Sequence, residues 1–227
     1  IAEELLLPLA TKDLAASLGA SRRCALQLAA QHRSPAKKRR RSGVAGGPRI
    51  AGDALAGRTW WWFEVAMASL GFVASALQPA GKASEHTKVV EDAVEALLDG
   101  CVNVLDICEF LPSAEESDLS AALLQALQAA LVVLAAAGDS SHMKRILTAI
   151  LSKSRSDDVE VRLGSVRCCH KIWTDLGVQA AAGLSEVVMY ASELLEDEDS
   201  RVEAAVRLMI KAVEECTGQS LQDSLKH

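Results

Sequence analysis

The last quarter of the chain, from about residue 157 to residue 225, carries one pattern of polar and apolar positions written twice. Asp158, Val161 and Gly177 recur 41 residues later as Asp199, Val202 and Gly218. A period in the forties with helical spacing inside each copy is typical of HEAT or armadillo-type helix pairs. The repeat therefore predicts an all-α fold, an α-solenoid of antiparallel helix pairs that cover one another's apolar faces.

Apolar residues between and within the two copies follow helical spacing. One expected face, in the helix that starts near residue 183, consists of Leu184, Val187, Val188, Ala191, Leu194 and Leu195. The other, after an N-cap at Asp199 or Ser200, consists of Val202, Ala205, Val206, Met209, Ile210 and Val213. Gly218 suits the position after the second helix. We expect Val161, Val166, Val202 and Met209 to be buried, and Glu196, Asp197 and Glu198 to be exposed at the corner between the helices.

Breaks in the helical pattern divide the whole chain into four segments. We expect a helix pair at 1–32, a basic flexible loop at 33–58, helical repeats at 59–156 and C-terminal HEAT repeats at 157–227. Within the third segment the pattern predicts helices at about 87–110, 114–137 and 139–154, the second of them opened by a capping box at 113–116.

Composition supports the helical class. The chain is 50% hydrophobic but only 4% aromatic, and Ala and Leu, both strong helix formers, dominate its apolar residues. The six cysteines mostly lie inside apolar helical patterns, which indicates buried, reduced thiols. The stretch 59–77 carries a single charge and three consecutive tryptophans, and we interpret it as a buried solenoid helix rather than a membrane span. Since the first residue is Ile rather than Met, we expect the chain to be a fragment, a processed product or an incomplete gene model.

Charge is distributed unevenly along the chain. Residues 1–60 carry 11 Lys and Arg against 4 Asp and Glu, whereas residues 61–140 carry 2 against 12 and residues 141–227 carry 11 against 14. The net charges of these segments are +7, −10 and −3. A basic leader on an acidic body favours targeting or nucleic-acid contact at one end and protein contact elsewhere.

No arrangement of reactive side chains predicts an enzyme, a cofactor, a metal or a small-molecule substrate. Gly81 and Lys82 resemble the end of a phosphate-binding loop, but that loop's first glycine and its final Ser or Thr are missing. Cys168, Cys169 and His170 are consecutive, so on a helix they point about 100° apart and do not converge on one ion. The acidic run 193–199 lacks the central glycine of a calcium loop.

The sharpest short motif is a run of five cations in the expected loop, formed by Lys37, Lys38, Arg39, Arg40 and Arg41. Contiguous cations of this kind indicate a nuclear localisation signal or a contact with RNA phosphates. The alternative is a solvated charge run without a partner. We favour a functional role because nothing else in the loop requires such a concentration of cations.

The C-terminal quarter carries more specific motifs than its class requires. They are Leu176 with Gly177, the run YASELLEDED from Tyr190 to Asp199, and the ending at Gly218 with Ser220 and Leu221. Over about 157–225 the chain resembles the C-terminal end of the giant HEAT-repeat subunit of the nucleolar small-subunit processome, the U-three small nucleolar RNA-associated protein ten family. Members of that family tend to have leucine where Gly183 stands and proline where Ser185 stands.

The resemblance implies a non-catalytic scaffold in ribosome biogenesis that acts in the nucleus and nucleolus. Its family engages the 5′ external spacer of nascent pre-ribosomal RNA and supports processing of the 18S precursor. The implied partners are processome proteins, pre-rRNA and small nucleolar RNA, with no membrane involved. The alternative is a generic HEAT-repeat adaptor of the transport-receptor or phosphatase-scaffold type, with an incidental basic loop.

Overall fold

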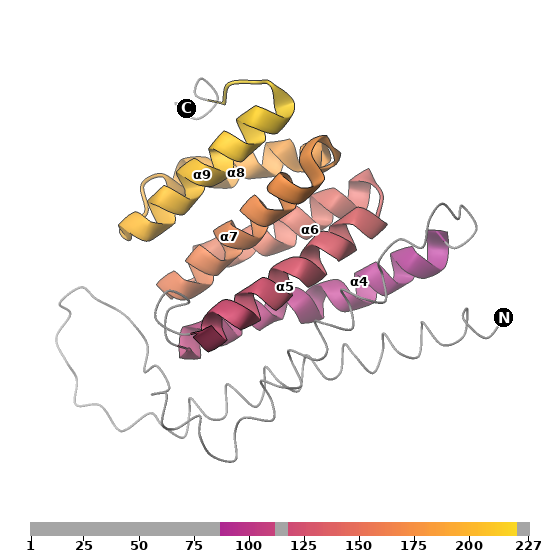
Figure 1. Cartoon of the computed structure of the whole chain (residues 1–227), viewed down its shortest axis with the longest axis horizontal. Coiled ribbons are helices and arrows are strands. Elements are labelled where there is room, and N and C mark those ends of the chain that lie inside the picture. Colours follow the sequence, from indigo (N-terminus) through magenta and orange to yellow (C-terminus); the bar gives the residue numbers. More distant parts are fainter. Residues whose placement is uncertain (1–86, 112–117, 222–227) are drawn as a thin grey trace, which may run out of the picture.

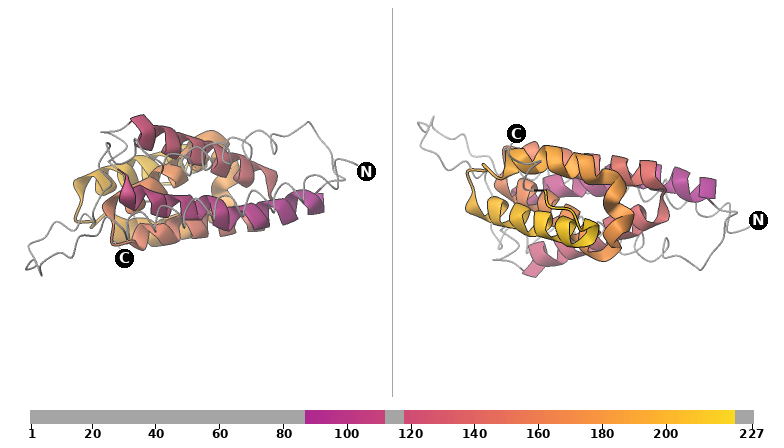
Figure 2. Two further views of the ribbon diagram at one scale, coloured as in Figure 1. Left: turned by 90° about the horizontal axis from the view of Figure 1, so that it is seen from below. Right: turned by 90° about the horizontal axis from the view of Figure 1, so that it is seen from above.

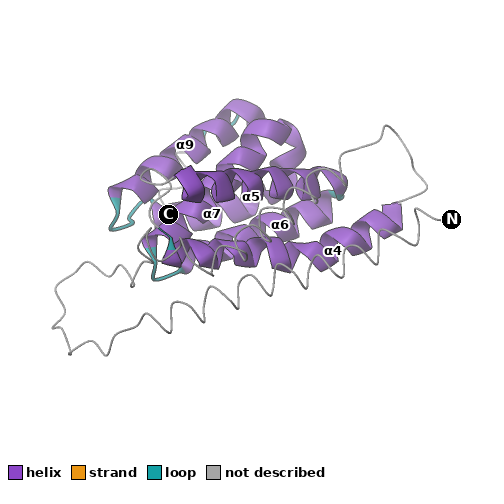
Figure 3. Ribbon diagram, turned by 60° about the horizontal axis from the view of Figure 1, so that its bottom comes forward, coloured by secondary structure: helices purple, strands orange, loops and turns teal. Residues whose placement is uncertain are grey.

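The computed structural model describes residues 87–111 and 118–221, and all regular elements in these residues are helical (Figure 3). The elements in chain order are α4 (Thr87–Asn103), η1 (Val104–Phe110), α5 (Asp118–Ala137), α6 (Ser140–Ser152), η2 (Lys153–Arg155), α7 (Val159–Leu176), η3 (Gly177–Gly183), α8 (Leu184–Leu194) and α9 (Ser200–Thr217). The predicted all-α class is confirmed. The predictions made for 1–32, 33–58, 59–77 and 113–116 lie outside the described residues.

The helices stack in two layers. Helices α4, α6 and α8 form one layer, and α5, α7 and α9 form the other (Figure 1; end views in Figure 2). Within each layer the middle helix contacts both neighbours, so α7 lies between α5 and α9, and α6 lies between α4 and α8. Across the layers, α4 contacts α5, α5 contacts α6, α6 contacts α7, and α8 contacts α9. This succession of helix pairs, each packed on the next, is the arrangement of an α-solenoid.

The 41-residue repeat marks equivalent helix ends. Asp158 caps α7 because its Oδ1 accepts the backbone N–H of Glu160 at 2.8 Å, and Asp199 caps α9 in the same way with Arg201 at 2.9 Å. Gly177 and Gly218 follow the two helices with φ of 55° and 68°, a region that side-chain-bearing residues rarely adopt. Both pairs of termini are therefore set by residues that the repeat singled out.

The predicted apolar faces form the core. Val161, Val166, Val202 and Met209 are buried, as expected. In α8 the buried members of the predicted face are Val187, Ala191 and Leu194, while the remaining three are partly buried against the same core. Tyr190 is buried as well, although the predicted face did not include it.

The prediction of a single helix at 87–110 is wrong for its last seven residues. The α-helix ends at Asn103 and the chain continues as the 3₁₀-helix η1. Buried residues across this junction recur every three positions, with Cys101, Val104 and Ile107 in one row and Val102 and Leu105 in another. Three residues per turn is the period of a 3₁₀-helix, so the tighter turn buries both rows together.

Helix α5 is the most apolar of the described helices. It ends at Ala137 before Gly138, as predicted, and Asp139 caps the next helix by accepting from the N–H groups of Ser141 and His142. Its stretch Ser120–Ala137 is long and apolar enough to cross a membrane by length and composition, and 44% of it is buried inside the fold. Partial burial between other helices is also what a core helix shows, and α5 packs on both α4 and α7.

One departure from the resembling family has a packing explanation. Gly183 is buried at the start of α8, and a Cβ at this position would meet the Leu147 side chain of α6 at 2.2 Å. Any side chain at 183 would therefore require Leu147 to move. In this chain the Leu147 side chain fills the space beside Gly183.

Candidate functional site

Of the three residues that sequence analysis considered for metal binding, Cys168 and Cys169 belong to the core, and His170 is half-buried. Cys168 and Cys169 are fully buried, and burial raises the pKa of the Cys169 thiol to about 12. Burial and the neighbouring Lys171 lower the pKa of the half-buried His170. Among residues 87–111 and 118–221 no three His, Cys, Asp or Glu side chains gather in a way that could hold a metal ion. These thiols are therefore packing residues.

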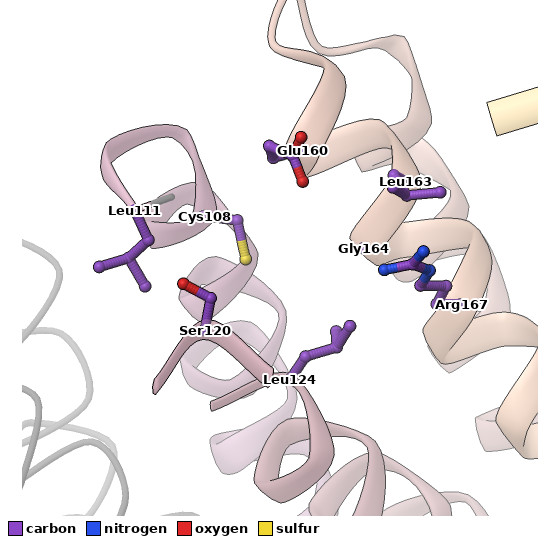
Figure 4. Close-up of a pocket in the computed structure, with 8 residues that line it drawn as sticks. All are labelled: Cys108, Leu111, Ser120, Leu124, Glu160, Leu163, Gly164 and Arg167. Carbon is purple, nitrogen blue, oxygen red and sulfur yellow. The ribbon is translucent and has the colours of Figure 1, made fainter. Parts of the chain in front are cut away.

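A hollow lies between η1, α5 and α7 (Figure 4). It is lined by Cys108, Leu111, Ser120, Leu124, Glu160, Leu163, Gly164 and Arg167. Its volume of about 20 Å³ is room for roughly one water molecule. Burial, followed by the negative charge of Glu160, raises the pKa of the Cys108 thiol to about 12. The hollow is thus too small for a substrate.

The polar chemistry of the fold concentrates at the corner between α8 and α9. Arg162 of α7 reaches this corner, where its Nε and Nη2 donate to the two oxygens of Asp197 at 2.8 Å and 2.9 Å. Its Nη1 donates to the backbone oxygens of Ser156 and Asp157. The prediction that Asp197 is exposed is therefore wrong, because this pairing leaves its side chain only 7% exposed. Glu196 and Glu198 are exposed as predicted.

A second arginine joins the same two repeats. Arg201 donates to the Glu160 carboxylate at 2.9 Å and to the Asp199 carboxylate at 3.0 Å. Hydrogen bonding to Asp199, together with the charge of Glu160, raises the pKa of Arg201, and hydrogen bonding to Arg201 lowers the pKa of Asp199. The Glu160 side chain is only 6% exposed, whereas the Arg201 side chain is 34% exposed, so the pair lies at the edge of the core.

Sequence analysis did not predict these ion pairs. Periodicity identifies buried and exposed faces but does not say which charged side chains meet. One signal was present, since Glu160 and Arg201 stand 41 residues apart, at equivalent positions of the two copies, with opposite charges. Arg155 is another such residue, since it donates twice to Glu193 and lies over the Tyr190 ring at 4.8 Å.

Surface cations of the helical body are neutralised by carboxylates. Between residues 144 and 211, nine Lys and Arg side chains make an ion pair with a carboxylate. The pairs with the most exposed cations are Lys144–Glu186, Arg145–Glu95, Arg155–Glu193, Lys171–Asp175, Arg207–Glu203 and Lys211–Glu215. Residues 87–221 carry 11 Lys and Arg against 23 Asp and Glu, a net charge of −12. A net charge of this sign repels a polyanion.

The predicted basic run, Lys37 to Arg41, lies outside the described residues, so its role stays a prediction. In the described residues, apolar packing and ion pairs between repeats hold the helices together.

Comparison with known proteins places the chain beside U3-associated proteins. It is 39% identical over 98 residues to the U3 small nucleolar RNA-associated protein 10 of Neurospora crassa, a match that covers 43% of this chain and 6% of that protein. The corresponding protein of Pyricularia oryzae is 38% identical over 101 residues, covering 44% and 6%. The HEAT repeat-containing protein 1 homolog of Drosophila melanogaster is 34% identical over 113 residues, covering 48% and 5%.

No family model matches the chain, and no solved structure matches it. The matched stretch spans about 6% of the length of the fungal relatives. The names of both groups of relatives agree with the predicted resemblance, and the stacked helix pairs agree with their HEAT repeats. Over the matched stretch, the chain is similar to proteins named U3 small nucleolar RNA-associated protein 10 and HEAT repeat-containing protein 1 homolog.

Proposed function

We propose that this chain is part of a non-catalytic scaffold in ribosome biogenesis, a component of the small-subunit processome that acts in pre-18S rRNA processing. Its partners are processome proteins, pre-rRNA and small nucleolar RNA, and its place of action is the nucleolus. The observation that carries the proposal is the similarity to relatives named for their association with U3 small nucleolar RNA. The stack of helix pairs supports it, because such a stack offers extended surfaces for several partners at once.

The contribution of the chain is geometric. Arg162 of α7 binds Asp197 at the α8–α9 corner, and Arg201 of α9 binds Glu160 of α7. These bonds fix the positions of α7, the corner and α9 relative to one another. A partner that contacts two helices of one layer then meets a fixed spacing between them. The scaffold holds proteins and RNA side by side in this way without making or breaking a bond.

We assign different tasks to the segments predicted from the sequence. The basic segment 33–58 serves nuclear delivery and contact with RNA phosphates, while the helical segments 59–156 and 157–227 contact proteins. The acidic net charge and paired cations of the described body support this division.

Affinity purification from cells tests the proposal. A tagged form of the chain should enrich U3 small nucleolar RNA and the 5′ external spacer of pre-rRNA, measured by quantitative reverse transcription, together with processome proteins, measured by mass spectrometry. Ala204→Asp, at an exposed position, should keep this enrichment, whereas Val202→Asp, at a buried one, should lose it with the fold. Purification dominated by a small GTPase or by phosphatase subunits would instead establish a generic HEAT adaptor.

A further inference from the structure

Helix α7 has a neighbouring helix on each side and shows which residue types a helix in that position buries. It lies between α5 and α9, and both Val166 and Trp173 on it are fully buried. The 41-residue repeat assigns each of these residues an equivalent in α9. Val166 corresponds to Arg207, and Trp173 corresponds to Glu214. Two apolar residues that α7 buries are therefore replaced by charged residues in α9.

Both charged residues of α9 have partners close to their own helix. Arg207 donates to the Glu203 carboxylate at 2.6 Å and 3.0 Å, one turn earlier, and its side chain is 65% exposed. Glu214 accepts the backbone N–H of Leu221 at 2.7 Å, which draws the chain after α9 back onto the helix. Leu221 is only 3% exposed, so this returning segment covers part of the core itself.

We infer that the flank of α9 carrying Glu203, Arg207 and Glu214 is the closed end of the stack and remains in contact with water. A further helix pair placed there would bury an arginine and a glutamate where the repeat elsewhere buries a valine and a tryptophan. Another repeat of this type therefore does not pack on this flank.

Restoring the apolar residues of α7 in α9 tests this inference on the whole chain. The double variant Arg207→Val/Glu214→Trp is compared with Arg145→Val/Glu95→Trp, the same two exchanges at an exposed ion pair between α6 and α4. Light scattering after size exclusion, over a range of concentrations, should give the parent and the α6/α4 variant the same mass. The α9 variant should form concentration-dependent oligomers through its opened end.

Hydrogen–deuterium exchange then locates the association. In the oligomers of the α9 variant, amides of α9 should exchange more slowly as concentration rises, while those of the parent should be unaffected. The inference is overturned if the parent itself shows such protection in α9, or if the α9 variant stays as monomeric as its control. If the α9 variant loses helical circular dichroism, the single variant Arg207→Val is measured in the same way. Hydrogen exchange in α9 of the parent tests the inference without either variant.

Discussion

Glu160 and Arg201 stand at equivalent positions of two successive repeats and bind each other, with the Glu160 Oε1 2.9 Å from the Arg201 Nη1. The glutamate is buried, whereas the arginine side chain is 34% exposed and also bonds Asp199. The stack therefore joins its repeats by a charged bond between like positions, in addition to the apolar contacts that the helical periodicity predicts.

Removing the arginine of this pair should destabilise the fold more than removing an exposed arginine of the same helix. Arg201→Met leaves the buried Glu160 carboxylate without this donor and should lower the free energy of unfolding by about 2 kcal/mol. Arg207→Met, which breaks an exposed pair within one helix, should cost less than about 1 kcal/mol. Urea unfolding followed by circular dichroism measures both. Equal losses would show that the bond between repeats contributes nothing special.

The two helix-ending glycines should differ in their tolerance of a side chain. Gly218 has φ 68° and ψ 12°, in the left-handed region, so Gly218→Ala should cost about 1 kcal/mol of unfolding free energy. Gly177 has φ 55° and ψ −128°, which is open almost only to glycine, so Gly177→Ala should cost about 2–3 kcal/mol. A Cβ at 177 meets only the Cys216 sulfur at 3.9 Å, so the difference is due to the backbone. Thermal unfolding of the two variants should preserve this order.

Acid should weaken the corner between α8 and α9. Hydrogen bonding to Arg201 lowers the pKa of Asp199 in the folded chain, so the folded state binds a proton here less readily than the unfolded state. The stabilisation is complete above the ordinary aspartate pKa of about 3.9 and is lost as pH falls through the lowered value. Asp199→Asn still caps the helix but does not titrate. Its urea midpoint should therefore fall less than the parent's between about pH 5 and about pH 3; parallel declines would exclude this carboxylate as a source of the acid sensitivity.

Charge introduced on the buried face of α9 should unfold it. Val202 is fully buried, so Val202→Asp should cost more than about 4 kcal/mol. Ala204, two residues along, is exposed, and Ala204→Asp should change stability by less than about 0.5 kcal/mol. The face assignment would be refuted by melting temperatures that agree within a degree.

The basic run should control where the chain accumulates. Changing Lys37, Lys38, Arg39, Arg40 and Arg41 to Ala should abolish nuclear accumulation of a fluorescently tagged chain, because the acidic groove of an import receptor loses its ligand. Helical circular dichroism should be unchanged. A control removes five exposed cations of the body instead, at Lys144, Arg145, Lys171, Arg207 and Lys211, and should stay nuclear. Nuclear retention of the first variant would reduce the run to a solvated linker.

The periodicity of the sequence was sufficient to predict features that depend only on a residue's own position in a helix. The caps at Asp158 and Asp199, the terminal glycines and the buried valines follow from local backbone geometry and from one apolar face. The placement of Cys168 and Cys169 in the core followed from the same reasoning.

What depends on a partner far along the chain was not predictable. Asp197 lies in an acidic run that looks solvated, and only the arrival of Arg162, 35 residues earlier, buries it. The change from α4 to η1 at Asn103 has the same origin, since the three-residue spacing of buried positions becomes visible only once the neighbouring helices define what is buried. The ion pairs at the corner between α8 and α9 join residues far apart in the sequence, so they were the least predictable part of the described residues.

The self-neutralised surface of the helical body has a consequence for how salt should act on any complex with RNA. Binding to a polyanion is driven by the release of condensed counterions, in proportion to the phosphates that cations neutralise. Cations already held by Glu95, Asp175, Glu203 or Glu215 release few of these ions. If the run from Lys37 to Arg41 supplies the contacts to single-stranded RNA, the logarithm of the affinity should fall against that of the salt concentration with a slope of about −3.5. A helical body that adds nothing to this slope leaves its protein contacts intact at salt concentrations that strip the chain from RNA.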